Sequence, residues 1–191
     1  MSGISASEHR LMKIVGIGLN KTGTKTLGVC LRHWGFKHRS CDDAAFQMCR
    51  NGRISDLLTH MKDYDSFEDW PWPLVYKHID RAFPGTKFIL TRRATAETWF
   101  MSLCRHATRK GPSQYRAYVY GHEMPHGHKT EHIDVYERHN RCVRAYFNDR
   151  PGQLLEVSWE EGDGWDVLAR FLGLERPRIP FPHANSSALK S

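Results

Sequence analysis

The sequence predicts a single three-layer α/β domain whose mostly parallel sheet of about four to five strands is flanked by helices. Short apolar runs alternate with amphipathic segments along the chain, which is the pattern of parallel strands joined by helical crossovers. The 191 residues are enough for one such domain with a real core and too few for two comfortable ones. We therefore expect one domain over residues 12–180, between a flexible tail at 1–11 and a second tail at 181–191.

Apolar runs bounded by turn residues locate the strands. Residues 13–18 hold two glycines and indicate a buried parallel strand that ends in a tight turn. Residues 87–91, with the sequence KFILT, are the clearest strand of the chain. Shorter strands are predicted at 36–39, 66–69 and 153–157.

Helical periodicity follows each predicted strand. It begins at Lys25 after the first strand, and Gly35 ends it. After the clearest strand, Trp99, Leu103 and His106 have the spacing of core residues on one helix face. The helices that we predict beyond the first lie within 42–62, from the prolines at 71 and 73 to residue 83, and over 94–110, 131–149 and 165–172.

Residues 111–130 differ from the rest of the chain. Glycines and prolines interrupt a stretch that holds three tyrosines and three histidines, so we predict a long loop or lid inserted in the domain. His122, His126 and His128 lack a metal-ligand spacing, and we expect them to be solvated. The aromatic candidates for an acceptor pocket, or else for the core, are Trp70, Trp72, Tyr115, Tyr118 and Tyr120.

Composition limits the classes of function. A formal net charge of +7 favours an anionic partner, but the basic residues are spread along the chain, which favours a small anion over nucleic acid. The apolar content of 40% excludes a largely disordered chain. Five cysteines without C-x-x-C spacing indicate reduced thiols, and we find no signal peptide and no membrane span in the sequence. We therefore predict a cytoplasmic protein.

Residues 16–26, GIGLNKTGTKT, have the composition of a phosphate-binding loop between a strand and a helix. Gly23 lets the backbone approach an anion, and Lys21 would reach over a phosphate from the strand side. The nucleotide-kinase pattern requires a lysine directly after the second glycine, whereas Thr24 separates Gly23 from Lys25 here. The loop therefore favours a different phosphate ligand.

The stretch KTGTKTL at 21–27 resembles the loop of sulfotransferases that use 3'-phosphoadenosine 5'-phosphosulfate (PAPS), in which the lysine also precedes the glycine. The resemblance implies a P-loop-NTPase-like fold, PAPS as donor, 3'-phosphoadenosine 5'-phosphate (PAP) as product, a small-molecule acceptor and no metal. Lys21 would be the catalytic cation. Lys25 stands where the family usually has Thr or Ser, as an extra ligand or a surface residue. The donor-binding residues that the resemblance implies for this loop are Asn20, Lys21, Thr22, Gly23, Thr24, Lys25 and Thr26.

A second part of the chain resembles the same family. These enzymes bind the donor's 3'-phosphate with an arginine at a strand end and a serine eight positions later in the next helix. Here Arg92 and Arg93 end a strand, and Ser102 follows Arg93 by nine positions. Either arginine could hold the phosphate, and we favour Arg93 with Ser102, since a guanidinium and a hydroxyl suit a dianion.

A general base is expected at the carboxyl end of a central strand. Glu68 and Asp69 both fit, and we favour Asp69 because the Trp-Pro pair after it forces a turn toward the cleft. The alternative is that Asp69 caps the helix that starts near Pro71. His78, in the middle of that helix, is a weaker candidate.

Two other functions stay open. A small-molecule kinase with an irregular ATP loop would need a carboxylate for magnesium, for which Glu156 or Asp69 is the nearest match. A basic domain that binds a polyanion ranks last, because no known nucleic-acid module is present. The acceptor and the oligomeric state are not predicted by the sequence.

Overall fold

Five short strands form one sheet in the computed structural model, which describes residues 13–182. They are β1 Ile14–Gly16, β2 His38–Arg39, β3 Ser66–Phe67, β4 Lys87–Thr91 and β5 Leu154–Val157. Their order is β2-β3-β1-β4-β5, and every neighbouring pair is parallel. The predicted α/β class is confirmed, with a sheet that is entirely parallel. The predicted tail at 1–11 and residues 183–191 of the second tail lie outside the described residues.

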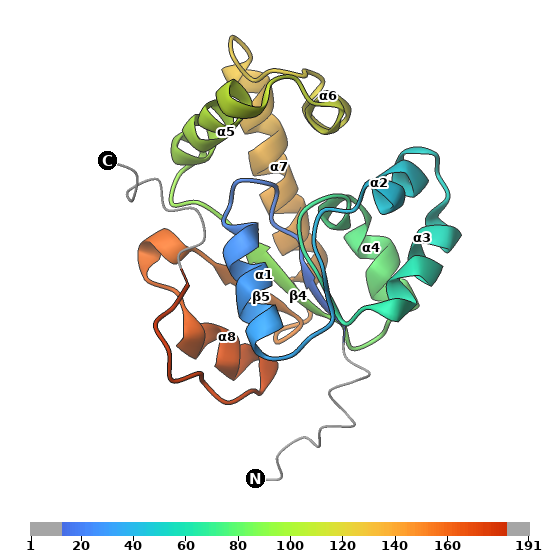
Figure 1. Cartoon of the computed structure of the whole chain (residues 1–191), viewed down its shortest axis with the longest axis vertical. Coiled ribbons are helices and arrows are strands. Elements are labelled where there is room, and N and C mark those ends of the chain that lie inside the picture. The colour runs from blue at the N-terminus through green and yellow to red at the C-terminus, as the bar shows by residue number, and fades with distance from the viewer. Residues whose placement is uncertain (1–12, 183–191) are drawn as a thin grey trace.

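Helices surround this sheet. The α-helices are α1 Thr24–His33, α2 Asp43–Arg50, α3 Ile54–His60, α4 Trp72–Ala82, α5 Ala96–Lys110, α6 Gln114–Tyr120, α7 Lys129–Phe147 and α8 Trp165–Leu172. Two short 3-10 helices are η2 Met61–Asp63 and η3 Trp159–Glu161. In Figure 1, α1 and α8 lie on one side of the sheet and α7 on the other, while α5 and α6 stand above its carboxyl edge. Each helix predicted from periodicity is present, with small shifts at the ends.

Alternate residues of the central strands face opposite layers. Ile14 and Ile89 pack with Leu27 of α1 in a cluster that also includes α8. Val15 and Phe88 face the other way, into a cluster with α4 and α7. All five side chains are fully buried. Because both faces of the sheet are covered, the central strands β1 and β4 have mainly apolar sequences without polar alternation.

The prediction of one long loop over residues 111–130 was wrong in part, because α6 lies within it. Gly111 and Gly121 have φ of 75° and 82° and are the C-caps of α5 and α6. The buried guanidinium of Arg116 donates to the carbonyl oxygens of Gly111 and Glu123, the latter at 2.7 Å, and so ties both flanks of α6 together. The glycines that suggested a loop are therefore helix boundaries.

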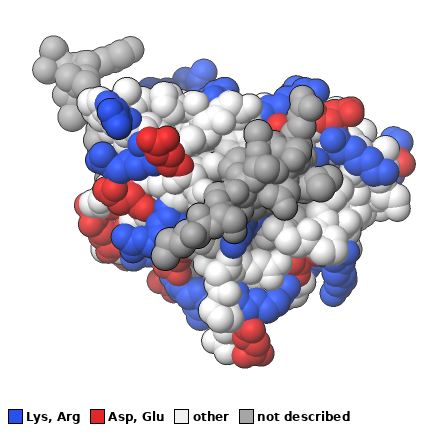
Figure 2. Space-filling model, turned by 90° about the horizontal axis from the view of Figure 1, so that it is seen from below, with Lys and Arg blue, Asp and Glu red and all other residues white. Residues whose placement is uncertain are grey.

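Charged side chains are mixed on the face shown in Figure 2, where basic and acidic residues alternate around its rim instead of forming one basic patch. This distribution gives no support to a polyanion-binding surface on that face. Within residues 13–182, no helix combines the length and the apolar character needed to cross a membrane.

Candidate functional site

The loop between β1 and α1 lies at the carboxyl edge of the sheet, beside the ends of β3 and β4. Lys21 and Gly23 in this loop both have left-handed backbones, with φ of 71° and 93°. This conformation is rare for a residue that has a side chain, and holding Lys21 in it costs roughly 1–3 kcal/mol. The surrounding structure must therefore fix the loop firmly.

Hydrogen bonds to three elements fix the loop. The Thr22 hydroxyl donates to a loop carbonyl oxygen (2.7 Å) and shares a hydrogen bond with the hydroxyl of Thr91 in β4 (2.6 Å). The indole N–H of Trp99 in α5 donates to the Asn20 carbonyl oxygen (2.9 Å). The Tyr120 hydroxyl of α6 donates to Asn20 Oδ1 (2.7 Å). We predicted that the side chains of Asn20 and Thr22 contact PAPS. In this structure they form the hydrogen bonds that fix the conformation of the loop.

Gly23 joins the loop to α1. A Cβ atom at this position would overlap the indole of Trp159, whose Nε1 donates to the Gly23 carbonyl oxygen (3.1 Å). No side chain of residues 13–182 caps α1, so the amide groups of its first turn and the positive end of its dipole face the loop. A phosphate binds in such an arrangement. Thr24 and Thr26 are buried in this turn, and Lys25 is exposed.

Positive charge is concentrated around Lys21. Burial lowers the pKa of its ammonium group, and nearby cations lower it further, whereas the carboxylate of Asp69 acts in the opposite direction. The cations are Arg109, Lys25 and Arg93. Such a cluster is costly unless an anion joins it, so the charges favour a multiply charged anionic ligand.

Asp69 follows β3 and faces this cluster. Its backbone is left-handed, with φ of 68°, and its carboxylate accepts a hydrogen bond from the Trp70 amide (3.0 Å). Burial and the neighbouring charge of Glu68 raise the pKa of Asp69 to about 7, against the opposing effect of Lys21. A carboxyl group with this pKa can exchange a proton near neutral pH. The alternative that its side chain caps α4 is wrong, because Pro71 occupies the N-cap position and no side chain caps that helix within the described residues.

Glu68 is fully buried beneath the loop instead. Ser40 donates to its Oε1, and the His38 ring lies 3.7 Å from the same oxygen. Burial raises the pKa of Glu68, but hydrogen bonds from His38, Ser40 and Thr24 lower it by more. The pKa of this carboxyl group is therefore below its usual value. Glu68 is thus an ionised support under the first turn of α1, and Asp69 is the carboxylate on the open side.

Arg93 and Ser102 come together as the sequence predicted. Arg93 Nη2 donates to Ser102 Oγ at 3.3 Å, and its Nε donates to the Lys21 carbonyl oxygen at 2.8 Å. Its Nη1 forms an ion pair with Glu160, whose second oxygen accepts from the Ala94 amide (3.1 Å). An anion, here a carboxylate, is therefore already bound by these donors.

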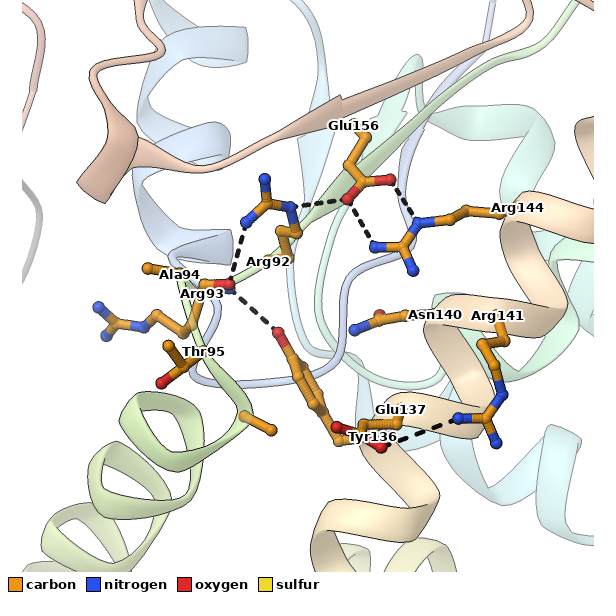
Figure 3. A pocket seen from close by; sticks show the side chains of 11 residues that line it. Arg92, Arg93, Ala94, Thr95, Tyr136, Glu137, Asn140, Arg141, Arg144 and Glu156 are labelled. Atoms are coloured by element: carbon orange, nitrogen blue, oxygen red, sulfur yellow. Dashed lines mark hydrogen bonds and ion pairs between the residues drawn. The ribbon is translucent and has the colours of Figure 1, made fainter.

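Arg92 turns to the opposite side of β4. It pairs with Glu156 at 2.7 Å and Glu161 at 2.6 Å, and Arg144 of α7 donates twice to Glu156 at 2.7 Å. Figure 3 shows Arg92, Arg144 and Glu156 beside a pocket of about 440 Å³, with the Arg93 guanidinium pointing away from Glu156. Of the two arginines, Arg93 is the one beside Ser102. Glu156 is neutralised by two arginines, which leaves it poorly suited to hold magnesium.

His106 was not expected at the site. Its core spacing is misleading: Trp99 and Leu103 are fully buried, whereas His106 is half-buried on the side of α5 that faces the cations. Burial, then the charges of Lys21 and its neighbours, lower the pKa of His106 to about 4. The sequence contains one indication that His106 is not a core residue. Arg109 lies one helical turn after it and makes that face of α5 polar.

The remaining candidates lie away from Lys21 or inside the core. Trp70 and Trp72 are buried core residues, and Tyr115 packs against the cluster beneath α5 and α6. Tyr118 is exposed and, with the exposed His78, lines a second pocket of about 440 Å³ between α4, α6 and α7.

Comparison with known proteins gives one family. The sulfotransferase domain family matches residues 13–120 and 108–189. The chain is also 23% identical over 217 residues to the Ava biosynthesis cluster protein M of Aspergillus versicolor, a match that covers 92% of this chain and 82% of that protein. Together the two matched segments span nearly all of the α/β domain, including the loop, Arg93 and Ser102. The chain belongs to the sulfotransferase domain family.

Proposed function

We propose that this protein transfers a sulfuryl group from PAPS to a hydroxyl or amine of a small-molecule acceptor. The observation that carries the proposal is the position of Lys21, which lies among further cations at the start of α1 and opposite Asp69. We treat residues 12–180 as one sulfotransferase-like unit, with residues 111–130 as a lid that contains α6.

Two anion sites support PAPS as the donor. The first turn of α1, with Gly23 and Lys21, offers backbone amides and an ammonium group to the 5'-phosphosulfate. Arg93 and Ser102 offer a guanidinium and a hydroxyl to the 3'-phosphate. The Arg93 Nε hydrogen bond to the Lys21 carbonyl oxygen couples the two sites, so both phosphate groups of one nucleotide could be held at once.

When PAPS is bound, its S–O bond to the 5'-phosphate breaks and sulfur forms a bond to the acceptor. Lys21 then stabilises the negative charge that develops on the oxygen released from sulfur. Asp69 takes the proton that the acceptor hydroxyl or amine loses, for which a pKa of about 7 is well matched. Glu68 keeps the first turn of α1 in place through Thr24 and is not the base.

The acceptor is expected to be a small molecule. The fungal relative is named for a biosynthesis cluster, which favours an acceptor from small-molecule biosynthesis. The lid and the second pocket are the proposed places for its selection, because α6 contacts the loop through Tyr120 and lines that pocket through Tyr118.

Calorimetric titration with PAP tests the donor. We expect micromolar or tighter binding of PAP without added metal, and weaker binding of adenosine 5'-phosphate, which lacks the 3'-phosphate. Binding of ATP with magnesium but not of PAP would refute the proposal in favour of a small-molecule kinase. Steeply salt-dependent binding of nucleic acid that PAP does not compete would instead support a polyanion-binding domain.

A further inference from the structure

We propose that His122, His128 and Glu131 form a binding site for a divalent transition metal ion such as Zn²⁺, between the end of α6 and the start of α7. This site is separate from the Lys21 loop and does not depend on the proposed sulfuryl transfer. Its three side chains each offer one ligand atom, and these atoms all lie within 4.8 Å of one another.

The backbone brings these residues together. Gly121 and Gly127 have φ of 82° and 81°, so the chain turns back on itself and returns His128 to His122. The two imidazole rings stack with centroids 3.5 Å apart and planes 11° from parallel. His128 Nδ1 lies 3.8 Å from Glu131 Oε1, one helical turn further along α7.

Closing the site needs only side-chain motion. Bonds of about 2.0–2.1 Å to Zn²⁺ place tetrahedral ligand atoms roughly 3.4 Å apart. The three ligand atoms lie within 4.8 Å of one another, so each pair must approach by about 1.4 Å at most. Because each nitrogen lone pair lies in its ring plane and the two planes are nearly parallel, one ring must rotate before both nitrogens can bind the same ion. His122 and His128 are half-buried and Glu131 is exposed, which leaves room for this rotation.

A buried histidine next to the cluster provides an independent indication. His132 is fully buried, and its Nδ1–H donates to the His128 carbonyl oxygen at 2.7 Å. The other ring nitrogen, Nε2, is therefore an acceptor, and it has no hydrogen-bond partner among the described residues. An unpartnered buried acceptor costs free energy. The centroids of the His122 and His132 rings are 5.9 Å apart, so this unpartnered acceptor lies next to the cluster, where water bound to the metal could satisfy it.

The donor set selects the class of ion. Two imidazoles and one carboxylate suit borderline ions such as Zn²⁺ and Co²⁺, whereas Mg²⁺ and Ca²⁺ prefer oxygen ligands. Three protein ligands leave the fourth tetrahedral position for water. The ion would join the two ends of the α6–α7 connection. His132 of α7 stacks on Tyr120 of α6, with ring centroids 5.0 Å apart, and so links this connection to the helix that contacts the Lys21 loop.

The test uses the full chain without a polyhistidine tag, freed of metal with a chelator. Co²⁺ is titrated while the visible absorption of bound cobalt is recorded, and Zn²⁺ is then added as competitor. The variants are His122→Ala, His128→Ala and Glu131→Gln. His126→Ala is the matched control, because His126 belongs to the same connection but is exposed and hydrogen-bonds Thr108 (3.2 Å) instead of joining the cluster.

We expect one Co²⁺ per chain, displaced by Zn²⁺, and unchanged binding in His126→Ala. Replacing His122 or His128 should weaken Co²⁺ binding by more than about 10-fold. Even residues that only hydrogen-bond to a metal ligand typically change metal affinity by about 10-fold or more when they are replaced. Thermal melting of the metal-free variants checks their folding, and Zn²⁺ should raise the melting temperature of the wild type and of His126→Ala alone. Absence of one-to-one binding at micromolar Co²⁺, or equal losses in His126→Ala, would overturn the proposal.

Discussion

Replacing Glu160 with glutamine should make the protein bind PAP more tightly. Glu160 accepts from Arg93 Nη1, part of the guanidinium that we assign to the 3'-phosphate, and from the Ala94 amide beside it. A phosphate that binds Arg93 Nη1 must displace this carboxylate. Glu160 is thus an internal competitor for the site, and glutamine removes its charge while keeping its size.

The magnitude follows from the exposure of the pair. The side chain of Arg93 is 25% exposed and that of Glu160 is 34% exposed, so the ion pair is partly screened by solvent. Such pairs contribute about 1 kcal/mol at most, and this amount corresponds to a roughly five-fold change in affinity. We therefore expect the dissociation constant for PAP to fall in Glu160→Gln, by about five-fold at most.

Calorimetry at constant pH and salt measures this effect, with two controls. Glu161→Gln is the matched variant, because Glu161 pairs with Arg92 on the other side of β4 and should not affect PAP. Adenosine 5'-phosphate is the matched ligand, because it lacks the group that displaces Glu160. Weaker PAP binding in Glu160→Gln, or an equal gain for adenosine 5'-phosphate, would refute the assignment of Arg93 to the 3'-phosphate.

Three further predictions concern the loop and the carboxylate opposite it. Lys21→Ala should lower the rate of PAPS-dependent PAP release by about 10²–10³-fold with an unchanged circular dichroism spectrum, because it removes the cation that stabilises the leaving oxygen; a normal rate would exclude Lys21 from the mechanism. The rate in the wild type should rise with pH as Asp69 loses its proton, with an apparent pKa of about 7. The Asp69→Asn variant should be nearly inactive, and its residual rate should not show this rise. An unchanged pH profile in the variant would assign the base elsewhere. Gly23→Ala should lower the free energy of unfolding by more than Gly85→Ala does, because both positions have positive φ but only Gly23 also meets Trp159. Equal losses of about 1 kcal/mol in thermal or urea denaturation would show that the contact with Trp159 is unimportant.

The fold was predictable because its signals are local. The apolar run before Gly16 and the Gly-Thr-Lys composition after it predict a strand, a turn and a helix without reference to other segments. The helix at 165–172 was predicted with the same bounds as α8, since Gly173 ends it with φ of 68°. The pairing of Arg93 with Ser102 was predicted from the resemblance to the sulfotransferase family, although the spacing here is one position longer than usual.

Contacts between distant segments were not predictable in the same way. Glu160 meets Arg93 across 67 positions of the chain, and no pattern near either residue indicates the other. His106 was assigned to the core because its spacing matches that of Trp99 and Leu103, yet spacing on a helix face does not say where the buried stripe ends. The environment of His106 depends on Lys21, which only the folded chain brings near.

Backbone strain links the two residues that the proposed chemistry needs. Within residues 13–182, Lys21 and Asp69 are the two non-glycine residues with positive φ. They follow the neighbouring strands β1 and β3, so a left-handed turn at each strand end directs one ammonium group and one carboxyl group to the same edge of the sheet. Such strain persists only where the surrounding structure enforces it, and it is concentrated at functional sites. The two lysine positions therefore correspond to two geometries. In the nucleotide-kinase pattern the lysine follows the glycine and belongs to the helix. Lys21 precedes Gly23 and extends from a strained turn toward Asp69.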